Sequence, residues 1–196
     1  MSMAQKKGHY TVADYALWPE GERWELIDGE AYLMTPAPSR RHQQIAAQLV
    51  GQFLASLQGR PCTVYPAPSD LTFGDKADDQ ADTVVQPDLF VMCGSHGGTE
   101  NRVIGVPVLI IEILSPSSAR RDKIVKLALY QRVGVKEYWI VDPIYEVIDV
   151  FVHNGTEYGR SQTVAKDDSL ALSTLDGVSV DVEAVFTQNR APETEE

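Results

Sequence analysis

The chain has 196 residues, of which 43% are hydrophobic and 23% are charged, a composition typical of globular proteins. This length is enough for one domain with a core of its own, and no apolar run approaches the roughly 20 residues that a membrane helix needs. The formal net charge of −11 argues against a protein that binds nucleic acid through a generally basic surface, although residues 120–136 are locally basic.

The first part of the chain predicts a short helix, a hairpin and a long helix. Thr11 is placed to cap the short helix, and residues 24–34 have the pattern of a hairpin with its turn at Asp28-Gly29. Ser39 is placed to cap the long helix. Along that helix the large apolar residues recur every four positions and predict one buried stripe, formed by Ile45, Leu49, Phe53 and Leu57.

The middle of the chain predicts short strands and then one long apolar strand. Residues 64–91 have the pattern of short strands with an acidic loop at 75–82, and residues 94–98 that of a flexible connection. Residues 108–114 are apolar and rich in β-branched side chains except for Glu112, as expected of a strand that is buried on both faces.

A helix follows this strand, and its two sides differ in character. It is expected to begin near Ser117 or Ser118 and to end at Gly134, because glycine favours the left-handed conformation that follows many helices. One side carries polar residues at the spacing i, i+4, i+8, namely Asp122, Lys126 and Tyr130. The residues expected to face the core are Ile124, Leu127, Ala128 and Val133.

The last part of the chain predicts mainly strands. Residues 137–142 form a buried strand, and residues 147–152 and 157–164 flank Asn154-Gly155, a strong hairpin signal. Residues 108–142 therefore contain a strand, a helix and a second strand, which is the pattern of a parallel pair with its crossover. The whole order predicts an α+β fold, with a mixed sheet flanked by helices and additional β-hairpins.

The chain as a whole predicts one cytoplasmic domain. Residues 1–188 are expected to form this single domain, and residues 189–196 a disordered acidic tail. Cys62 and Cys93 stand in unrelated contexts without a CxxC pattern, so both are expected to be reduced thiols. The N-terminus lacks the apolar stretch of a secretory signal, which also favours a cytoplasmic location.

A homodimer is expected from the strands near the C-terminus. Their apolar surface exceeds what one small sheet needs to bury, and it includes Trp139, Ile148, Val150 and Phe151. A two-fold dimer would also present two sites to a nucleic-acid duplex.

Glu112 is the strongest indication of a functional site, because a carboxylate inside an apolar strand must be paired, protonated or bound to a metal. Asp88 supplies a second carboxylate at the head of the apolar stretch 89–92. Magnesium binds one or two carboxylates together with other oxygen ligands, so Asp88, Glu112 and the backbone carbonyl of Ile113 are candidate ligands. Lys126 could stabilise the attacking hydroxide or the transition state, which completes the parts of a metal-dependent phosphodiesterase site.

Other residues could join this site. Strand alternation could bring Glu25 to the same face as the metal, as a further catalytic residue. His42 lies early in the long helix beside two arginines, where it could contact phosphate. Arg121 and Tyr130 are further candidates for substrate binding.

Each of these residues also has a purely structural interpretation. Glu112 could form a buried ion pair with Lys126 or Arg121, as structural ion pairs also occupy strand ends. Asp88 could bond the backbone of its own turn, and Glu25 could be a surface residue of its strand. A single histidine such as His42 is more often structural than functional.

Several segments together resemble a known family. The longest are Trp-Glu-Leu-Ile-Asp-Gly-Glu at 24–30, Ile-Glu-Ile-Leu-Ser-Pro-Ser at 111–117 and Glu-Tyr-Trp-Ile-Val-Asp-Pro at 137–143. Shorter ones are Pro38-Ser39 with His42, Pro87-Asp88, Asp122 with Lys126 and Tyr130, and Gly134-Val135. In this order the pattern resembles the Uma-two family of restriction endonucleases, within the PD-(D/E)xK nuclease superfamily.

The resemblance implies a restriction-endonuclease-like fold and a divalent-metal site. By it, Asp88 stands for the superfamily aspartate and Glu112 for the second acidic residue. The superfamily places a lysine two residues after that acid, whereas this chain has Leu114. The resemblance implies that Lys126, on the following helix, takes over the role of the missing lysine.

Three functions fit these observations. The first is a cytoplasmic endonuclease that hydrolyses phosphodiester bonds in DNA with Mg²⁺ or Mn²⁺. The second is a non-catalytic binding or assembly protein that retains the nuclease fold. The third is a metal-dependent hydrolase of a smaller phosphate ester, which would suit the acidic net charge.

Overall fold

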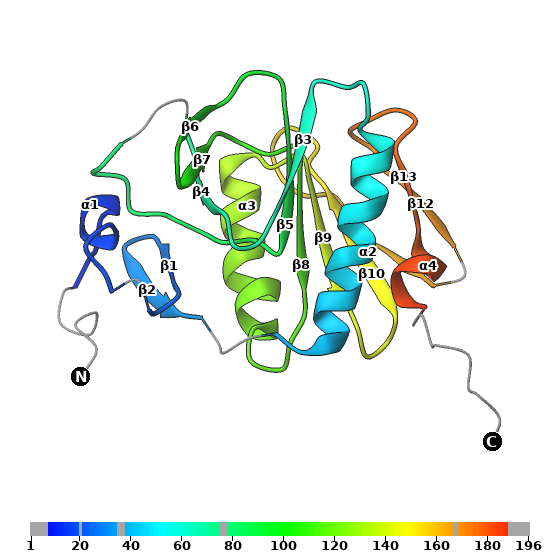
Figure 1. The fold of residues 1–196 in the computed structure, drawn as a ribbon, viewed down its shortest axis with the longest axis horizontal. Coiled ribbons are helices and arrows are strands. Elements are labelled where there is room, and N and C mark those ends of the chain that lie inside the picture. The colour runs from blue at the N-terminus through cyan, green and yellow to red at the C-terminus, as the bar shows by residue number, and fades with distance from the viewer. Residues whose placement is uncertain (1–7, 20, 35–37, 75–77, 167, 188–196) are drawn as a thin grey trace.

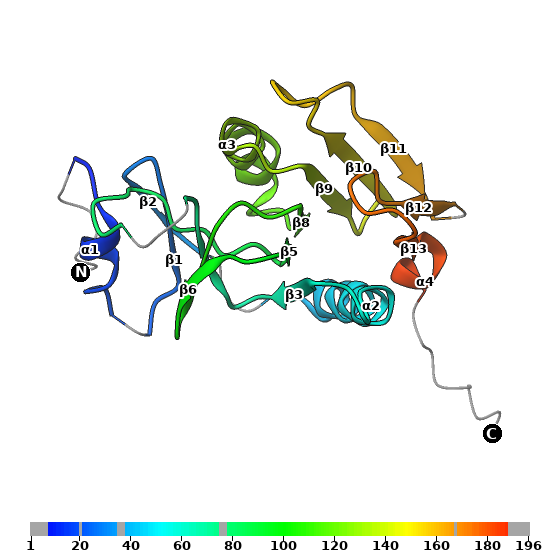
Figure 2. The same cartoon turned by 90° about the horizontal axis from the view of Figure 1, so that it is seen from above.

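The computed structural model describes residues 8–19, 21–34, 38–74, 78–166 and 168–187. A six-stranded mixed sheet forms its centre, with helix α2 (Arg40–Ser56) on one face and helix α3 (Leu127–Val133) on the other (Figures 1 and 2). The expected α+β fold is thereby confirmed. The acidic tail expected at 189–196 lies outside the described residues.

The central sheet contains one parallel pair of strands, and its other pairs are antiparallel. Strands β8 and β9 pair in parallel, and the other neighbouring strands of this sheet pair antiparallel. The crossover between β8 and β9 is helical, as the sequence predicted, but it includes a π-helical segment, η2 (Arg121–Lys126), before the regular helix α3. Across the sheet the strands are β11 (Gln162–Ala165), β10 (Val147–Val152), β9 (Glu137–Asp142), β8 (Leu109–Ile113), β5 (Leu89–Cys93) and β3 (Cys62–Pro66).

Smaller elements flank the two ends of this sheet. At one end lie α1 (Val12–Tyr15), the predicted hairpin of β1 (Trp24–Ile27) and β2 (Glu30–Leu33), and a sheet of β4 (Asp70–Thr72), β7 (Arg102–Ile104) and β6 (Gly97–Thr99) (Figure 1). At the other end lie β12 (Ser169–Ala171), β13 (Ser179–Asp181) and α4 (Val182–Phe186). The expected flexible connection at 94–98 therefore ends in a strand, because its last two residues, Gly97 and Gly98, pair with β7.

The alternation of side chains along β8 creates two cores, one on each face of the sheet. Leu109, Ile111 and Ile113 pack with the buried stripe of α2, whose residues Ile45, Leu49, Phe53 and Leu57 are all buried as predicted. Ile110 points to the opposite face, where α3 lies. Since side chains two residues apart share a face, Glu112 is also directed towards the helical crossover.

The side of the crossover helix that faces the core differs in part from the prediction. Leu127 and Val133 are partly buried, but Ile124 is 58% exposed and Ala128 is exposed as well. The buried positions are instead Asp122, Lys126, Leu129 and Tyr130. These four positions follow the regular helical spacing i, i+4, i+7 and i+8, so the side that carries the polar residues is the one that packs on the sheet. Lys126 and Tyr130 can be buried there because both bind Glu112.

Cys62 and Cys93 form a disulfide, and the expectation of two reduced thiols is wrong for this structure. The two residues lie opposite each other in the antiparallel pair of β3 and β5, with their Cα atoms 4.0 Å apart. Sequence spacing concealed this proximity, because the pairing of the two strands is a tertiary contact. Among the described residues, no helix has the length and apolar character that a membrane span requires.

The strand residues that suggested a dimer are covered within the chain. Trp139, Ile148 and Val150 belong to the core on the α2 face, and Phe151 is partly buried against the other core. Helices α2 and α4 and the β12–β13 hairpin contribute residues to this core and cover the apolar strand surface. The homodimer stays a prediction, but this apolar surface no longer supports it.

Two neighbouring residues of α2 test the core on this face. Phe53 is fully buried, with its ring centroid 6.0 Å from that of Trp139, whereas Leu54 is 61% exposed. Phe53→Ala should lower the free energy of unfolding by about 3–5 kcal/mol, because it removes a buried ring and leaves a cavity. Leu54→Ala should change it by less than about 0.5 kcal/mol. Urea unfolding of both variants measures the difference, and equal losses would contradict the packing described here.

Candidate functional site

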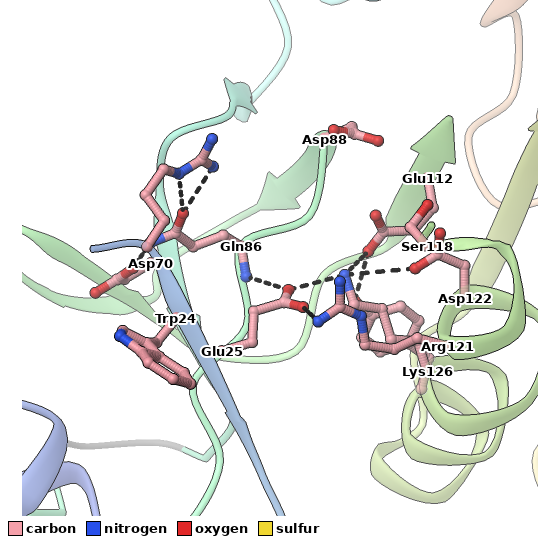
Figure 3. A network of polar contacts seen from close by, with 12 residues as sticks. Trp24, Glu25, Asp70, Gln86, Asp88, Glu112, Ser118, Arg121, Asp122 and Lys126 are labelled. Atoms are coloured by element: carbon pink, nitrogen blue, oxygen red, sulfur yellow. Dashed lines mark hydrogen bonds and ion pairs between the residues drawn. The ribbon is translucent and has the colours of Figure 1, made fainter. Parts of the chain in front are cut away.

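A buried lysine stands at the centre of the candidate site. The ammonium group of Lys126, on η2, lies 2.7 Å from Glu112 Oε1 on β8 and 2.8 Å from Glu25 Oε1 on β1. Asp122 Oδ1, one turn earlier on η2, is 3.8 Å from the same group. Figure 3 shows the carboxylates approaching Lys126 from different elements. Glu25, for which a surface position was the alternative, is thus a fully buried member of the site.

The predicted polar side of the crossover helix faces this cluster. Tyr130, one turn after Lys126, donates a hydrogen bond to Glu112 Oε1 over 2.9 Å. Its side chain is fully buried and is absent from the lining of the cavity described below. Tyr130 is therefore placed to orient Glu112, and the structure does not bring it to a position where it could contact substrate.

Arg121 adds a second positive charge on the side of Glu25. Its Nη1 atom lies 3.6 Å from Glu25 Oε2, and its guanidinium group lies over the ring of Tyr32 at 5.8 Å from the centroid. Glu25 Oε2 and Arg121 Nε are buried atoms without a hydrogen-bond partner. Charge therefore holds Arg121 against Glu25 at this point, without a hydrogen bond to Glu25 Oε2.

Asp88 is held beside the cluster by two partners. Its Oδ2 atom accepts a hydrogen bond from the backbone N–H of Ile113 over 2.8 Å and lies 3.1 Å from His42 Nε2. Asp88 immediately precedes β5, the antiparallel neighbour of β8, and this register brings it next to Glu112. The side chain of Asp88 therefore binds residues outside its own turn, contrary to the structural alternative. His42 reaches Asp88 from the first turn of α2, which Ser39 caps as predicted.

A cavity of about 800 Å³ opens onto these groups. Seven of the sequence-predicted site residues line it, namely Glu25, His42, Asp88, Glu112, Ile113, Arg121 and Lys126. The sequence did not single out the basic and polar residues that share this lining, which include Arg23, Arg41, Gln86, Ser118 and Lys123. Gln86 directly precedes the Pro87-Asp88 segment, and this neighbourhood was the only sequence signal that could have identified Gln86 as a site residue.

Burial and charge together govern the protonation of the cluster. Burial raises the pKa of Glu112 well above its usual value, and Asp122 and Asp88 raise it further against the opposing effect of Lys126. Burial alone would lower the pKa of Lys126, but the surrounding carboxylates outweigh it and raise this pKa. Lys126 therefore keeps its positive charge, while Glu112 would be stabilised as a carboxylate by any additional cation.

The charge of the cluster favours such a cation. Glu25, Asp88, Glu112 and Asp122 contribute four negative charges when ionised, against two positive charges from Arg121 and Lys126. In the described part of the chain, no group of three or more His, Cys, Asp or Glu side chains is arranged to hold a metal ion. A cation here would therefore rest on Asp88, Glu112, the carbonyl oxygen of Ile113 and water, a set that suits magnesium.

Comparisons with known proteins agree with the architecture. A family model named Uma2, with the description "Putative restriction endonuclease", matches residues 12–183. Over 176 residues the chain is 28% identical to "Uncharacterized protein slr1290" of Synechocystis sp., with 88% of this chain and 89% of that protein covered. The fold matches that of "a putative nuclease belonging to DUF820" from Anabaena variabilis with a TM-score of 0.71 at 19% identity, over 90% of this chain and 97% of the other.

Removal of the central lysine tests whether it holds the cluster together. Lys126→Met should lower the free energy of unfolding by about 3–5 kcal/mol, because it leaves buried carboxylates without their partner. The double variant Lys126→Met/Glu112→Gln should recover much of this loss, since it removes one of those charges as well. Lys123→Met, at an exposed position on the same segment, is the control. Denaturant unfolding that gives equal stabilities for Lys126→Met and Lys123→Met would contradict this role.

Proposed function

The chain belongs to the Uma2 family, described as "Putative restriction endonuclease", and on this premise we propose that it hydrolyses phosphodiester bonds in DNA with a divalent cation. The observation that carries this proposal is the grouping of Asp88, Glu112 and Lys126 at one cavity. A fold alone does not establish an activity, so the chemistry of these groups has to support it.

Asp88 and Glu112 would hold Mg²⁺ or Mn²⁺ together with the carbonyl oxygen of Ile113. Such a cation polarises a phosphoryl oxygen and lowers the pKa of a bound water. His42 and the backbone N–H of Ile113 fix the orientation of Asp88, and Tyr130 fixes that of Glu112. These contacts hold both carboxylates in position before substrate arrives, which would avoid a cost of reorganisation.

Lys126 provides the positive charge that would stabilise the extra negative charge of the transition state. Glu25 restrains this ammonium group from the side opposite Glu112, and Arg121 in turn neutralises Glu25. A lysine two residues after Glu112 would approach this carboxylate from the strand. Lys126 approaches the same carboxylate from the following helix. The presence of Leu114 at that position is therefore compatible with catalysis.

The rim of the cavity supports a polyanionic substrate. Four basic side chains line the cavity besides Lys126, namely Arg23, Arg41, Arg121 and Lys123. Arg41 pairs with Glu146 and Arg121 with Glu25, so Arg23 and Lys123 are the residues best placed to meet a phosphate. Local potential steers a charged substrate more than net charge does, so these groups can attract the phosphates of DNA although the whole chain carries a charge of −11. A smaller phosphate ester is the second candidate substrate, because the acidic surface elsewhere disfavours a long nucleic-acid contact.

Metal binding is tested by thermal unfolding. MgCl₂ or MnCl₂ should raise the melting temperature, because a cation that binds only the folded state adds about 2.7 kcal/mol of stability at a hundred times its dissociation constant. Asp88→Asn should abolish the increase. Asp149→Asn is the matched control, since Asp149 lies on β10 and binds Thr163 away from the cavity. An equal increase in the wild type and Asp88→Asn would place the cation elsewhere.

Catalysis is tested with purified protein, Mn²⁺ and three substrates: double-stranded DNA, RNA and bis(p-nitrophenyl) phosphate. We expect cleavage of DNA, and we expect Asp88→Asn and Glu112→Gln each to reduce its rate by at least about 10²-fold. Asp149→Asn should cleave as the wild type does. Cleavage of the small ester alone would favour the second candidate substrate, and a folded wild type that cleaves none of the three would support a non-catalytic protein.

A further inference from the structure

A second cavity, of about 490 Å³, lies next to the proposed catalytic cavity. Its walls come from β3, β4 and the β6–β7 hairpin, which lie together at one end of the central sheet (Figure 1). Pro68 and Gln86 line both cavities, so the two are direct neighbours. No part of the proposed hydrolysis uses this second cavity.

Two opposite charges meet in this cavity without forming an ion pair. Asp70 and Arg102 are cross-strand partners in the parallel pair of β4 and β7. Asp70 Oδ1 accepts hydrogen bonds from Tyr15 Oη over 3.1 Å and from Gln86 Nε2 over 2.8 Å. Arg102 Nε is buried without a hydrogen-bond partner. Asp70 and Arg102 therefore present a carboxylate and a guanidinium group from neighbouring strands to one cavity, where a ligand with complementary groups can bind both.

The cavity also offers a fixed aromatic surface. Tyr65 stacks on Phe90 with ring centroids 5.1 Å apart, and its hydroxyl lies 3.0 Å from His96 Nε2. His96 Nδ1 lies 3.2 Å from the carbonyl oxygen of Gly94, so Nδ1 carries the proton, and Nε2 accepts a hydrogen bond from the Tyr65 hydroxyl. Gly97 and Gly98 of β6 complete this part of the lining.

The charges of the lining indicate the chemistry of the ligand. Asp70 and Glu100 oppose a single cation, Arg102, so a phosphate group would meet more negative than positive charge. A neutral ligand with an N–H donor beside an acceptor matches Asp70 and Arg102, and a planar one can lie against Tyr65. Nucleobases have these properties, and proteins recognise unstacked bases through hydrogen bonds to their edges and contacts with aromatic side chains.

We propose that this cavity binds one unstacked nucleobase of the strand whose phosphate enters the neighbouring cavity. Its donor edge faces Asp70 and its acceptor edge faces Arg102. This inference rests on the proposed nuclease function, because it treats the two cavities as adjoining subsites for one substrate. The base is thereby read by side chains that take no part in hydrolysis.

Gln86 connects the two subsites. Its side-chain amide donates to Asp70 Oδ1 and accepts a hydrogen bond from Arg23 Nη2 over 2.8 Å. Its backbone N–H donates to Glu25 Oε1 over 2.9 Å, and the same carboxylate oxygen contacts Lys126 (Figure 3). Gln86 is therefore the single residue between a base bound at Asp70 and Glu25, the carboxylate that restrains the catalytic lysine.

The test measures the binding of the four deoxynucleoside 5′-monophosphates by calorimetry, with 2-deoxyribose 5-phosphate as the ligand that lacks a base. At least one mononucleotide should bind more tightly than the sugar phosphate. Asp70→Asn and Arg102→Gln should each weaken that binding by about tenfold, the scale of losing one base contact. Asp70→Asn keeps an oxygen acceptor for Tyr15 and Gln86, so it should remain folded, which a melting curve verifies. Asp149→Asn should bind as the wild type does.

The outcomes separate this inference from the proposed function, because DNA cleavage is measured on the same wild-type preparation. A wild type that cleaves DNA but binds no mononucleotide more tightly than the sugar phosphate would overturn the base subsite and leave the nuclease assignment intact. Equal mononucleotide binding by wild type, Asp70→Asn and Arg102→Gln would overturn it as well. A protein that binds the base through Asp70 but cleaves no nucleic acid would support the subsite and overturn the nuclease assignment.

Discussion

The ammonium group of Lys126 allows three carboxylates from separate elements to share one buried space. Glu25 comes from β1, Glu112 from β8 and Asp122 from η2. Isolated charges in such a place would cost many kcal/mol and would be neutralised by protonation. A buried ion pair of this kind is weak evidence for stability but good evidence for a defined geometry, because its partners hold only one arrangement. The cluster therefore joins the β1–β2 hairpin to the central sheet and the crossover helix.

The same geometry gives the catalytic proposal its content. Hydrogen bonds orient both proposed metal-binding carboxylates. The side chains that donate these bonds are not themselves proposed metal ligands. Tyr130 and Lys126 bind Glu112, whereas His42 and the backbone of Ile113 bind Asp88. Asp122, Lys126 and Tyr130 lie on one side of the crossover helix and are buried together. The crossover begins with a π-helical turn, and such turns recur at functional sites.

The position of the two cavities follows from how the hairpins cover one end of the sheet. β1 closes one side of the larger cavity through Glu25, and the β6–β7 hairpin forms one wall of the smaller cavity. Gln86 stands between them and binds groups on both sides. A fold with a bare central sheet would offer only Asp88 and Glu112. The added hairpins supply the restraint on Lys126 and the polar groups that could distinguish one substrate from another.

The sequence alone determined the local features, and tertiary contacts decided the rest. The stripe of α2, the cap at Ser39, the hairpin turn at Asp28-Gly29 and the end of the crossover helix at Gly134 all depend on residues close in sequence. Glu112 could be recognised because a carboxylate in an apolar strand needs a partner. Sequence could not tell which partner it has, nor that Glu25 is buried, that Cys62 faces Cys93, or that Ile124 is exposed. Strand register and the choice of which side of the crossover helix packs on the sheet set those contacts, and both depend on packing between segments far apart in the chain.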